Sequence, residues 1–252
     1  MITFIISVLK IVGLLGFLIF IHEGGHFIVA KLCKVKVNEF AIGFGPTILK
    51  KQGKETKYAL RLIPLGGFVS MEGEEEASDE EGSFSKASIP KRIAIVVAGA
   101  LVNIIFAIIL YFILGIIFGI QSTGDLQKSI NFAFEKTGTF VGSTFEGIGK
   151  LFTGQIGIDQ MTGPVGISGI VAQSSGVFEF FNLLAIISLS LGITNLLPIP
   201  ALDGGKILIL IIEAIRRKPL KQETEVKIQL VGFVFLITLA IFITYKDIVK
   251  LM

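Results

Sequence analysis

Long apolar stretches alternate with polar ones along this chain of 252 residues. A helix that crosses a membrane needs about 20 predominantly apolar residues. Four stretches meet this requirement, at about residues 4–30, 93–120, 178–200 and 228–246. The pattern therefore predicts a membrane α-helical fold with four transmembrane helices, organised as a single polytopic domain over residues 1–252.

The composition supports this class. Hydrophobic residues make up 52% of the chain and charged residues 17%, and the mean hydropathy is +0.79, which is too apolar for a soluble domain of this length. The net charge is only +3 and no basic patch is interleaved with aromatic residues, so nothing indicates a nucleic-acid partner. The single cysteine, Cys33, excludes an internal disulfide and a multi-cysteine zinc site. The first span lacks a small-residue cleavage site and is expected to be retained.

Residues 35–71, between the first two spans, differ from a plain loop. Short runs of alternating apolar and polar residues are separated by turn signals at 43–46, 51–54 and 64–67. We therefore expect a small membrane-associated β-sheet, which can reach membrane depth where protein covers it. One of its edges would be free to pair with an extended peptide. The alternative is a cytoplasmic hairpin with no part in substrate handling.

Two other segments connect the predicted spans. Residues 72–88 are acidic and rich in Gly and Ser, which is typical of a solvated, mobile linker. In residues 126–153, apolar residues recur mostly every three, four or seven positions, which predicts an amphipathic helix at the outer surface. A break at 162–167 then leads into a re-entrant or packed segment.

The positive charges orient the spans. Residues 31–92 carry eleven Lys and Arg and residues 201–227 carry six, whereas residues 121–177 carry three. By the positive-inside rule, the two richer segments are cytoplasmic. Both termini are therefore expected on the outer side of the cell membrane, and the C-terminal end of the first span is expected toward the cytoplasm.

That end of the first span holds three ionisable residues within five positions: His22, Glu23 and His26. Ionisable groups are costly in hydrocarbon, so the cluster needs a physical reason. Residues four apart share one face of a helix, so the chain's only two histidines can direct their imidazoles at one metal ion. Glu23 is then placed to take a proton from water at the metal. Alternatively, the histidines are satisfied by hydrogen bonds within a helix bundle.

A second polar motif, at residues 195–205, follows the third span and contains Pro198 and Pro200. Two prolines one residue apart remove backbone donors and force an unwound stretch, which at membrane depth must line protein or a wet cavity. Asp203 follows this break and is the available third ligand for a zinc site. The alternative is a helix N-cap, because residues 204–217 have the pattern of a short helix.

Taken in order, these motifs resemble those of the site-2 protease family of intramembrane zinc metalloproteases. The resemblance covers nearly the whole chain, at residues 22–26, 43–46, 61–69, 99–103, 163–167 and 195–205. Members of the bacterial envelope-stress branch carry a PDZ domain between the second and third spans. Here the amphipathic stretch begins within a few residues of Ile120, which leaves no room for such a domain.

The resemblance implies hydrolysis of peptide bonds within or near transmembrane segments of single-pass proteins or signal-peptide remnants, usually after an upstream site-1 protease has acted. His22, His26 and Asp203 would hold Zn²⁺, and Glu23 would act as general base and then acid. Asn195 would help to hold the substrate strand. The other candidates for substrate contact are Gly66, Gly67 and Asn103, although Asn103 can equally serve as a hydrogen-bonding contact between helices.

Two hypotheses from other classes stay open. A metal transporter could use His22, His26 and Asp203 as a midplane site, without needing Glu23. A non-catalytic scaffold that binds membrane peptides would hold no stoichiometric metal. For the protease, the expected location is the bacterial inner membrane, with the active site toward the cytoplasm.

Overall fold

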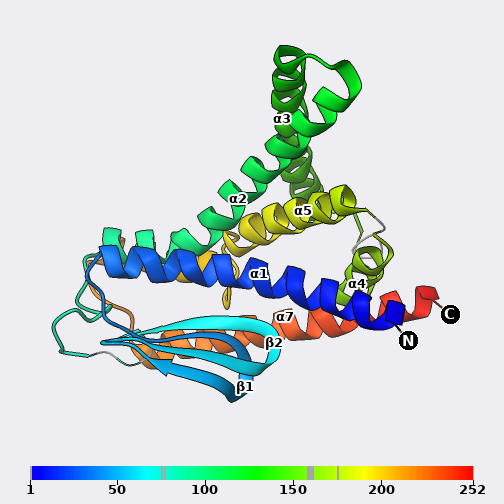
Figure 1. The fold of residues 1–252 in the computed structure, drawn as a ribbon. Helices are drawn as coiled ribbons and strands as arrows, with labels where there is room; N and C mark the ends of the chain where they lie inside the picture. Colours follow the sequence, from blue (N-terminus) through cyan, green and yellow to red (C-terminus); the bar gives the residue numbers. More distant parts are fainter. Residues whose placement is uncertain (1, 75, 77, 158–161, 175, 252) are drawn as a thin grey trace. The chain divides into compact units, whose positions relative to one another are not determined.

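The computed structural model describes residues 2–251, apart from 75, 77, 158–161 and 175 (Figure 1). The elements follow one another along the chain as α1 (Ile2–Leu32), β1 (Val37–Gln52), β2 (Lys57–Met71), α2 (Ile89–Thr123), α3 (Leu126–Phe152), α4 (Pro164–Gln173), α5 (Val177–Asn195), α6 (Asp203–Arg216) and α7 (Gln222–Leu251).

Among the described residues, four helices are long and apolar enough to cross a membrane: α1, α2, α5 and α7. The predicted fold class, four spans with a small sheet after the first, is confirmed. The third span, α5, ends at Asn195, whereas the sequence predicts the end of that span near residue 200. The helix ends earlier because Pro198 and Pro200 cannot donate backbone hydrogen bonds.

The chain divides into two compact units, which are described separately. The first, called the hairpin unit, comprises Val12–Asn103 and Gly192–Val234 and contains the sheet. The second, called the helical unit, comprises Met1–Ile11, Ile104–Leu191 and Phe235–Met252.

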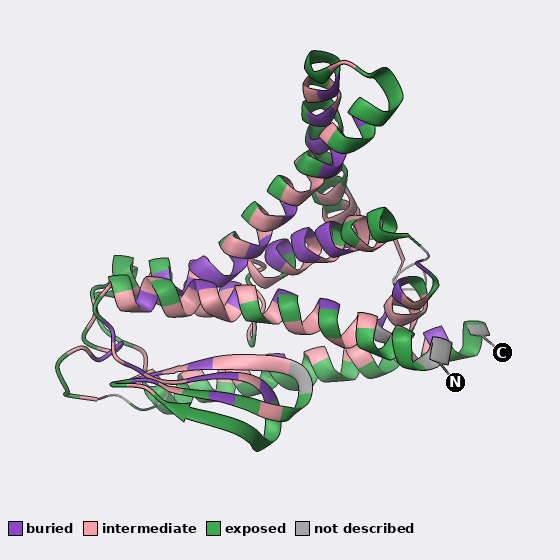
Figure 2. Cartoon of the chain, viewed as in Figure 1, coloured by how far each residue is buried: buried purple, intermediate pink, exposed green. Residues whose placement is uncertain are grey.

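In the hairpin unit, β1 and β2 form one sheet, in which pairing and burial differ from one part to another. Residues from Glu39 to Ile42 have partners on both sides, one set in 57–60 and the other in 67–70. Beyond this part, every residue from Phe44 to Gln52 is exposed (Figure 2). In the described sheet, residues 67–70 pair on one side only.

All three predicted turns reverse the chain. Residues 57–60 pair with 39–42 in parallel register and with 49–52 in antiparallel register, and residues 67–70 pair with 39–42 in antiparallel register. The chain therefore turns back between residues 42 and 49, at 53–56 and between residues 60 and 67. Gly43 and Gly45, at φ +86° and +81°, and Gly66, at φ +121°, lie in two of these reversals, where glycine tolerates positive φ because it has no Cβ.

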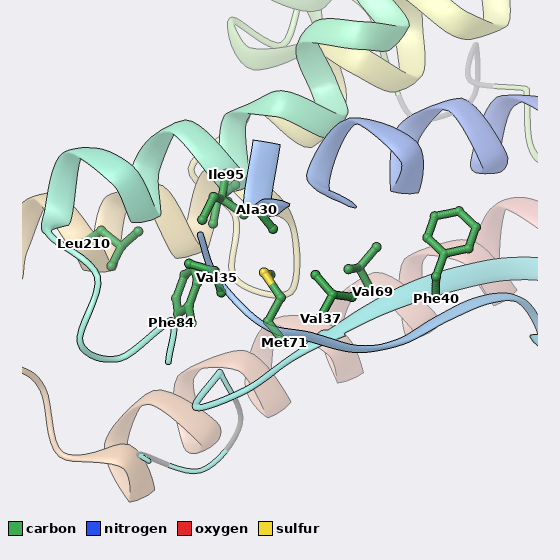
Figure 3. Close-up of a cluster of buried hydrophobic side chains, with 10 residues drawn as sticks. Ala30, Val35, Val37, Phe40, Val69, Met71, Phe84, Ile95 and Leu210 are labelled. Carbon is green, nitrogen blue, oxygen red and sulfur yellow. The ribbon is translucent and has the colours of Figure 1, made fainter. Parts of the chain in front are cut away.

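A hydrophobic cluster packs the sheet against the neighbouring helices (Figure 3). Phe84 belongs to it and is 3% exposed, although it lies in the acidic stretch 72–88. Its backbone N–H donates to the carbonyl of Glu72 at 2.7 Å. Part of this stretch is therefore packed, not the solvated linker that its composition suggested. The buried members of the cluster are Ala30, Val35, Val37, Phe40, Val69, Met71, Phe84, Ile95, Val96 and Leu210.

In the helical unit, charged side chains hold both ends of the short helix α4. The Oδ2 atom of Asp247 accepts a hydrogen bond from the backbone N–H of Gly166 at 2.8 Å. The Nζ atom of Lys10 donates to the carbonyl of Ser174 at 2.6 Å. A carboxylate at the N-terminus and an ammonium at the C-terminus both complement the helix dipole. The predicted break at 162–167 is thus the start of a clamped helix.

Candidate metal centre and active site

Three side chains from two distant parts of the chain converge in the hairpin unit. The Nε2 atoms of His22 and His26, one turn apart on α1, lie 3.3 Å from each other. Asp203 is the first residue of α6, and its Oδ2 atom lies 3.3 Å from His22 Nε2 and 3.6 Å from His26 Nε2. The structure therefore brings together the three residues that the sequence selected as metal ligands.

The geometry of these three atoms fits a zinc ion. Bonds of about 2.0–2.2 Å in a tetrahedral site place the ligand atoms about 3.3–3.6 Å apart. The observed separations fall in this range. In addition, Asp203 Oδ2 is buried and accepts no hydrogen bond from the described residues. A buried carboxylate oxygen without a donor is expensive, so a cation at this position would satisfy it.

The second helix fixes the orientation of His26. Its Nδ1 atom donates to the carbonyl of Ile95 on α2 at 2.9 Å, which leaves the Nε2 lone pair free to bind a metal. The two helices can approach this closely because Gly25 faces the backbone of Ala98, where a Cβ would lie 2.6 Å from the carbonyl oxygen. Gly99 leaves room for the ring itself, because a Cβ there would lie 2.3 Å from His26 Nε2.

Two glycines allow the loop before α6 to fold back onto the first turn of that helix. A Cβ on Gly204 would lie 2.1 Å from the carbonyl oxygen of Leu197, and one on Gly205 would lie 2.4 Å from that of Ile199. The loop carbonyls therefore rest directly on the helix backbone. This contact fixes the position of Asp203 at the start of the helix.

Asp203 is not the N-cap of α6. Leu202 occupies the N-cap position, with φ −103° and ψ 164°, and forms no side-chain cap hydrogen bond. The carboxylate of Asp203 points at the histidine pair instead. The capping alternative raised by the sequence is therefore wrong in this structure.

Glu23 and the three converging side chains line a cavity of about 200 Å³. Gly67 of β2 borders it, and a Cβ at that position would lie 3.1 Å from Glu23 Cγ. Glycine at this point lets the edge of the sheet come close to the glutamate. The cavity is thus bordered by the three candidate metal ligands, a carboxylate outside that set, and a strand edge.

An ion pair borders the same cavity. Lys206 Nζ, three residues after Asp203, lies 2.6 Å from Glu74 Oε1, and both side chains are about four-fifths buried. The lysine also lies over the ring of Phe84 at 4.9 Å. This pair could not be predicted from the sequence, because Glu74 lies in a stretch that resembles a solvated linker.

A larger groove of about 690 Å³ runs on from Asp203. One wall is formed by β2 at Phe68, Val69 and Ser70, and the opposite wall by the first three turns of α7. The groove therefore lies along the strand edge that has no second partner.

The other predicted contact residues lie differently. Gly67 borders the cavity, but Gly66, Asn103 and Asn195 are not among the residues that line it. Asn103 is fully buried within α2, and Asn195 is the last residue of α5. The substrate-binding roles of all four residues stay predictions.

The fold and this site define a membrane protein with a candidate metal centre and a separate carboxylate in one small cavity. Comparison with known families gives the same class: the model of Peptidase family M50 matches residues 10–239. The chain belongs to this family. It is accordingly a zinc-dependent intramembrane metalloprotease.

Curated relatives match along almost their whole length. A protein of Clostridium acetobutylicum that carries a zinc metalloprotease name is 30% identical, and the alignment covers 93% of this chain and 95% of the relative. The regulator of sigma-W protease RasP of Bacillus subtilis is 25% identical, over 98% and 99% of the two chains. The zinc metalloprotease RasP of Bacillus licheniformis is 26% identical, over 97% and 99%.

The alignment with the Bacillus subtilis protein extends over 419 positions, whereas this chain has 252 residues. That relative therefore has segments with no counterpart here. This agrees with the prediction that a PDZ domain is lacking between the second and third spans.

Proposed function

We propose that His22, His26 and Asp203 hold the catalytic zinc and that Glu23 is the proton-transferring group. The main support for this proposal is the convergence of the three donor atoms at separations that a tetrahedral zinc site requires. Glu23 lies in the same cavity but outside this set. Two histidines, one carboxylate and an open fourth position are a known catalytic arrangement for zinc.

When bound, zinc would supply Lewis acidity that activates water and polarises the scissile carbonyl. Glu23 then takes a proton from the attacking water and delivers it to the nitrogen of the leaving amine. His26 keeps its orientation through the carbonyl of Ile95. The remaining requirement is a substrate whose peptide bond is extended and accessible.

The free edge of β2 meets that requirement. Residues 67–70 pair with β1 on one side, and their other edge borders the cavity and the groove. A substrate segment that adds to this edge would form main-chain hydrogen bonds and would be held extended. Helix unwinding is necessary because a helical peptide bond is shielded by its own hydrogen bonds. Asn195, Gly66, Gly67 and Asn103 are proposed to support this bound strand.

The substrates we propose are transmembrane segments of single-pass proteins or signal-peptide remnants, cut after an upstream site-1 protease. The support comes from the four apolar helices and from the name of the Bacillus subtilis relative, which describes a regulator of sigma-W. From the distribution of Lys and Arg, we propose that both termini lie outside the cell and that the active site lies toward the cytoplasm.

The test is cleavage of a membrane-embedded reporter by purified protein. Glu23→Gln is expected to abolish cleavage while the zinc content stays at one ion per chain. Full cleavage by this variant would refute the catalytic role of Glu23.

The same purified proteins distinguish the protease from the two alternative functions, a metal transporter and a non-catalytic scaffold. A transporter would carry zinc across vesicles and would keep this activity in Glu23→Gln. A scaffold would contain no stoichiometric zinc in the unmodified protein.

A further inference from the structure

We infer that Gln229 of α7 is a positioning residue for the metal centre. It holds the loop that leads into Asp203 in a conformation which that loop would not adopt by itself. The inference deepens the proposed function and rests on Asp203 being a ligand. It assigns a role to α7, an apolar helix that provides no candidate ligand.

The loop contains an unfavourable residue two positions before Asp203. Ala201 has φ +73°, a region that residues with a Cβ rarely adopt. Such backbone persists only where its surroundings over-determine it. The sequence around Ala201 therefore has to be held from outside the loop.

Gln229 supplies that constraint. Its Oε1 atom accepts a hydrogen bond from the backbone N–H of Ala201 at 2.5 Å. One turn further along α7, Gly232 is buried against the same loop, and a Cβ there would lie 2.3 Å from the carbonyl oxygen of Pro200. Positions three apart share one face of a helix, so α7 holds the loop by a hydrogen bond and a close backbone contact.

Gln229 also lines the groove that runs from Asp203 along the edge of β2. Gln229, which holds the loop before Asp203, thus forms part of the surface where a substrate strand would lie. Its contribution should appear as metal affinity and metal geometry, because it reaches the centre only through Ala201 and the loop.

The experiment measures zinc affinity by competition with a chromophoric chelator on the full-length, detergent-purified protein. Gln229→Leu keeps the size of the side chain but removes the acceptor, and zinc binding should weaken about 10- to 100-fold, as for other supports of metal ligands. Gln229→Glu keeps an acceptor oxygen for Ala201 and should retain affinity near that of the unmodified protein. Gln222→Leu makes the same change two turns earlier on α7 and should not alter zinc affinity.

Gly232→Ala provides an independent test with Gln229 intact. Alanine is the better helix former, so weaker zinc binding would not reflect a weaker α7. The cobalt-substituted protein gives a second readout, since its visible absorption should change in Gln229→Leu and Gly232→Ala but not in Gln229→Glu.

The inference is overturned if Gln229→Leu and Gly232→Ala both bind zinc as tightly as the unmodified protein, or if Gln229→Glu binds as poorly as Gln229→Leu. In either case the proposed function stands as long as His22→Ala and Asp203→Asn lose zinc. Failure of the proposed function would look different, because those ligand variants would then keep their zinc.

Discussion

The Nδ1 atom of His26 donates a hydrogen bond to the backbone carbonyl of Ile95, 2.9 Å away on the neighbouring helix. A carbonyl can only accept, so the proton resides on Nδ1 and the Nε2 lone pair faces His22 and Asp203. The contact thus selects both the tautomer and the ring orientation that a metal requires.

Gly99→Ala tests this arrangement. The added Cβ would lie 2.3 Å from His26 Nε2, so the ring has to move away from the other two donor atoms. We expect zinc affinity to fall about 10- to 100-fold, with reporter cleavage falling in parallel.

Gly24→Ala is the matched control, because a Cβ at Gly24 has no atom within 4 Å. This variant should bind zinc like the unmodified protein. Unchanged zinc binding by Gly99→Ala would show that the ring has more freedom than the packing indicates.

Phe84→Ala should destabilise the hairpin unit. Phe84 is 3% exposed in the hydrophobic cluster, and loss of a buried aromatic side chain costs about 3–5 kcal/mol. The measurement is chemical unfolding in detergent. Phe145→Ala removes a side chain that is 56% exposed, and its effect should stay within about 0.5 kcal/mol. Equal effects of the two changes would mean that the segment around Phe84 is not packed.

Acidification should loosen the sheet through Glu39. Burial raises the pKa of its carboxyl group. Hydrogen bonds from Arg61 Nη2, at 2.7 Å, and Lys57 Nζ, at 3.1 Å, lower this pKa by more than burial raises it, so the net shift of the pKa is downward. A depressed pKa stabilises the fold above the unfolded-state value near 4.5, and this contribution is lost as the pH falls through the folded-state pKa.

The protection factors for hydrogen exchange of the β1 and β2 amides should therefore fall below about pH 4.5 in the unmodified protein. The Glu39→Gln variant should exchange faster already at neutral pH and should lack this acid-dependent step. The same pH profile in both proteins would exclude Glu39 as its origin.

The sequence was sufficient for the residues whose role depends on local spacing. The interval between His22 and His26 predicts a shared helix face, and the structure brings their Nε2 atoms to 3.3 Å. The two prolines before Asp203 indicate its position at a cavity, because an interrupted helix at membrane depth has to line protein or water. The helix α3 also begins and ends close to where the apolar periodicity predicts one.

Features that depend on long-range contacts could not be predicted. Gly43 and Gly45 predict a turn locally, but the sequence does not show that residues 57–60 pair between 39–42 and 49–52, the two segments on either side of that turn. Glu74 and Phe84 occur in a composition typical of solvated linkers, yet Lys206 and the hydrophobic cluster bind them. Gln229 is one of several polar residues in α7, and only its contact with the loop gives it a role.

The most direct test of the central claim is zinc X-ray absorption on the purified Glu23→Gln protein. The account predicts one zinc per chain, bound by two imidazole nitrogens and a carboxylate oxygen at about 2.0–2.2 Å. In the same background, loss of His22, His26 or Asp203 should each remove or rearrange the ion. An unchanged spectrum after Asp203→Asn would contradict the account, because zinc would then be held elsewhere or without this carboxylate.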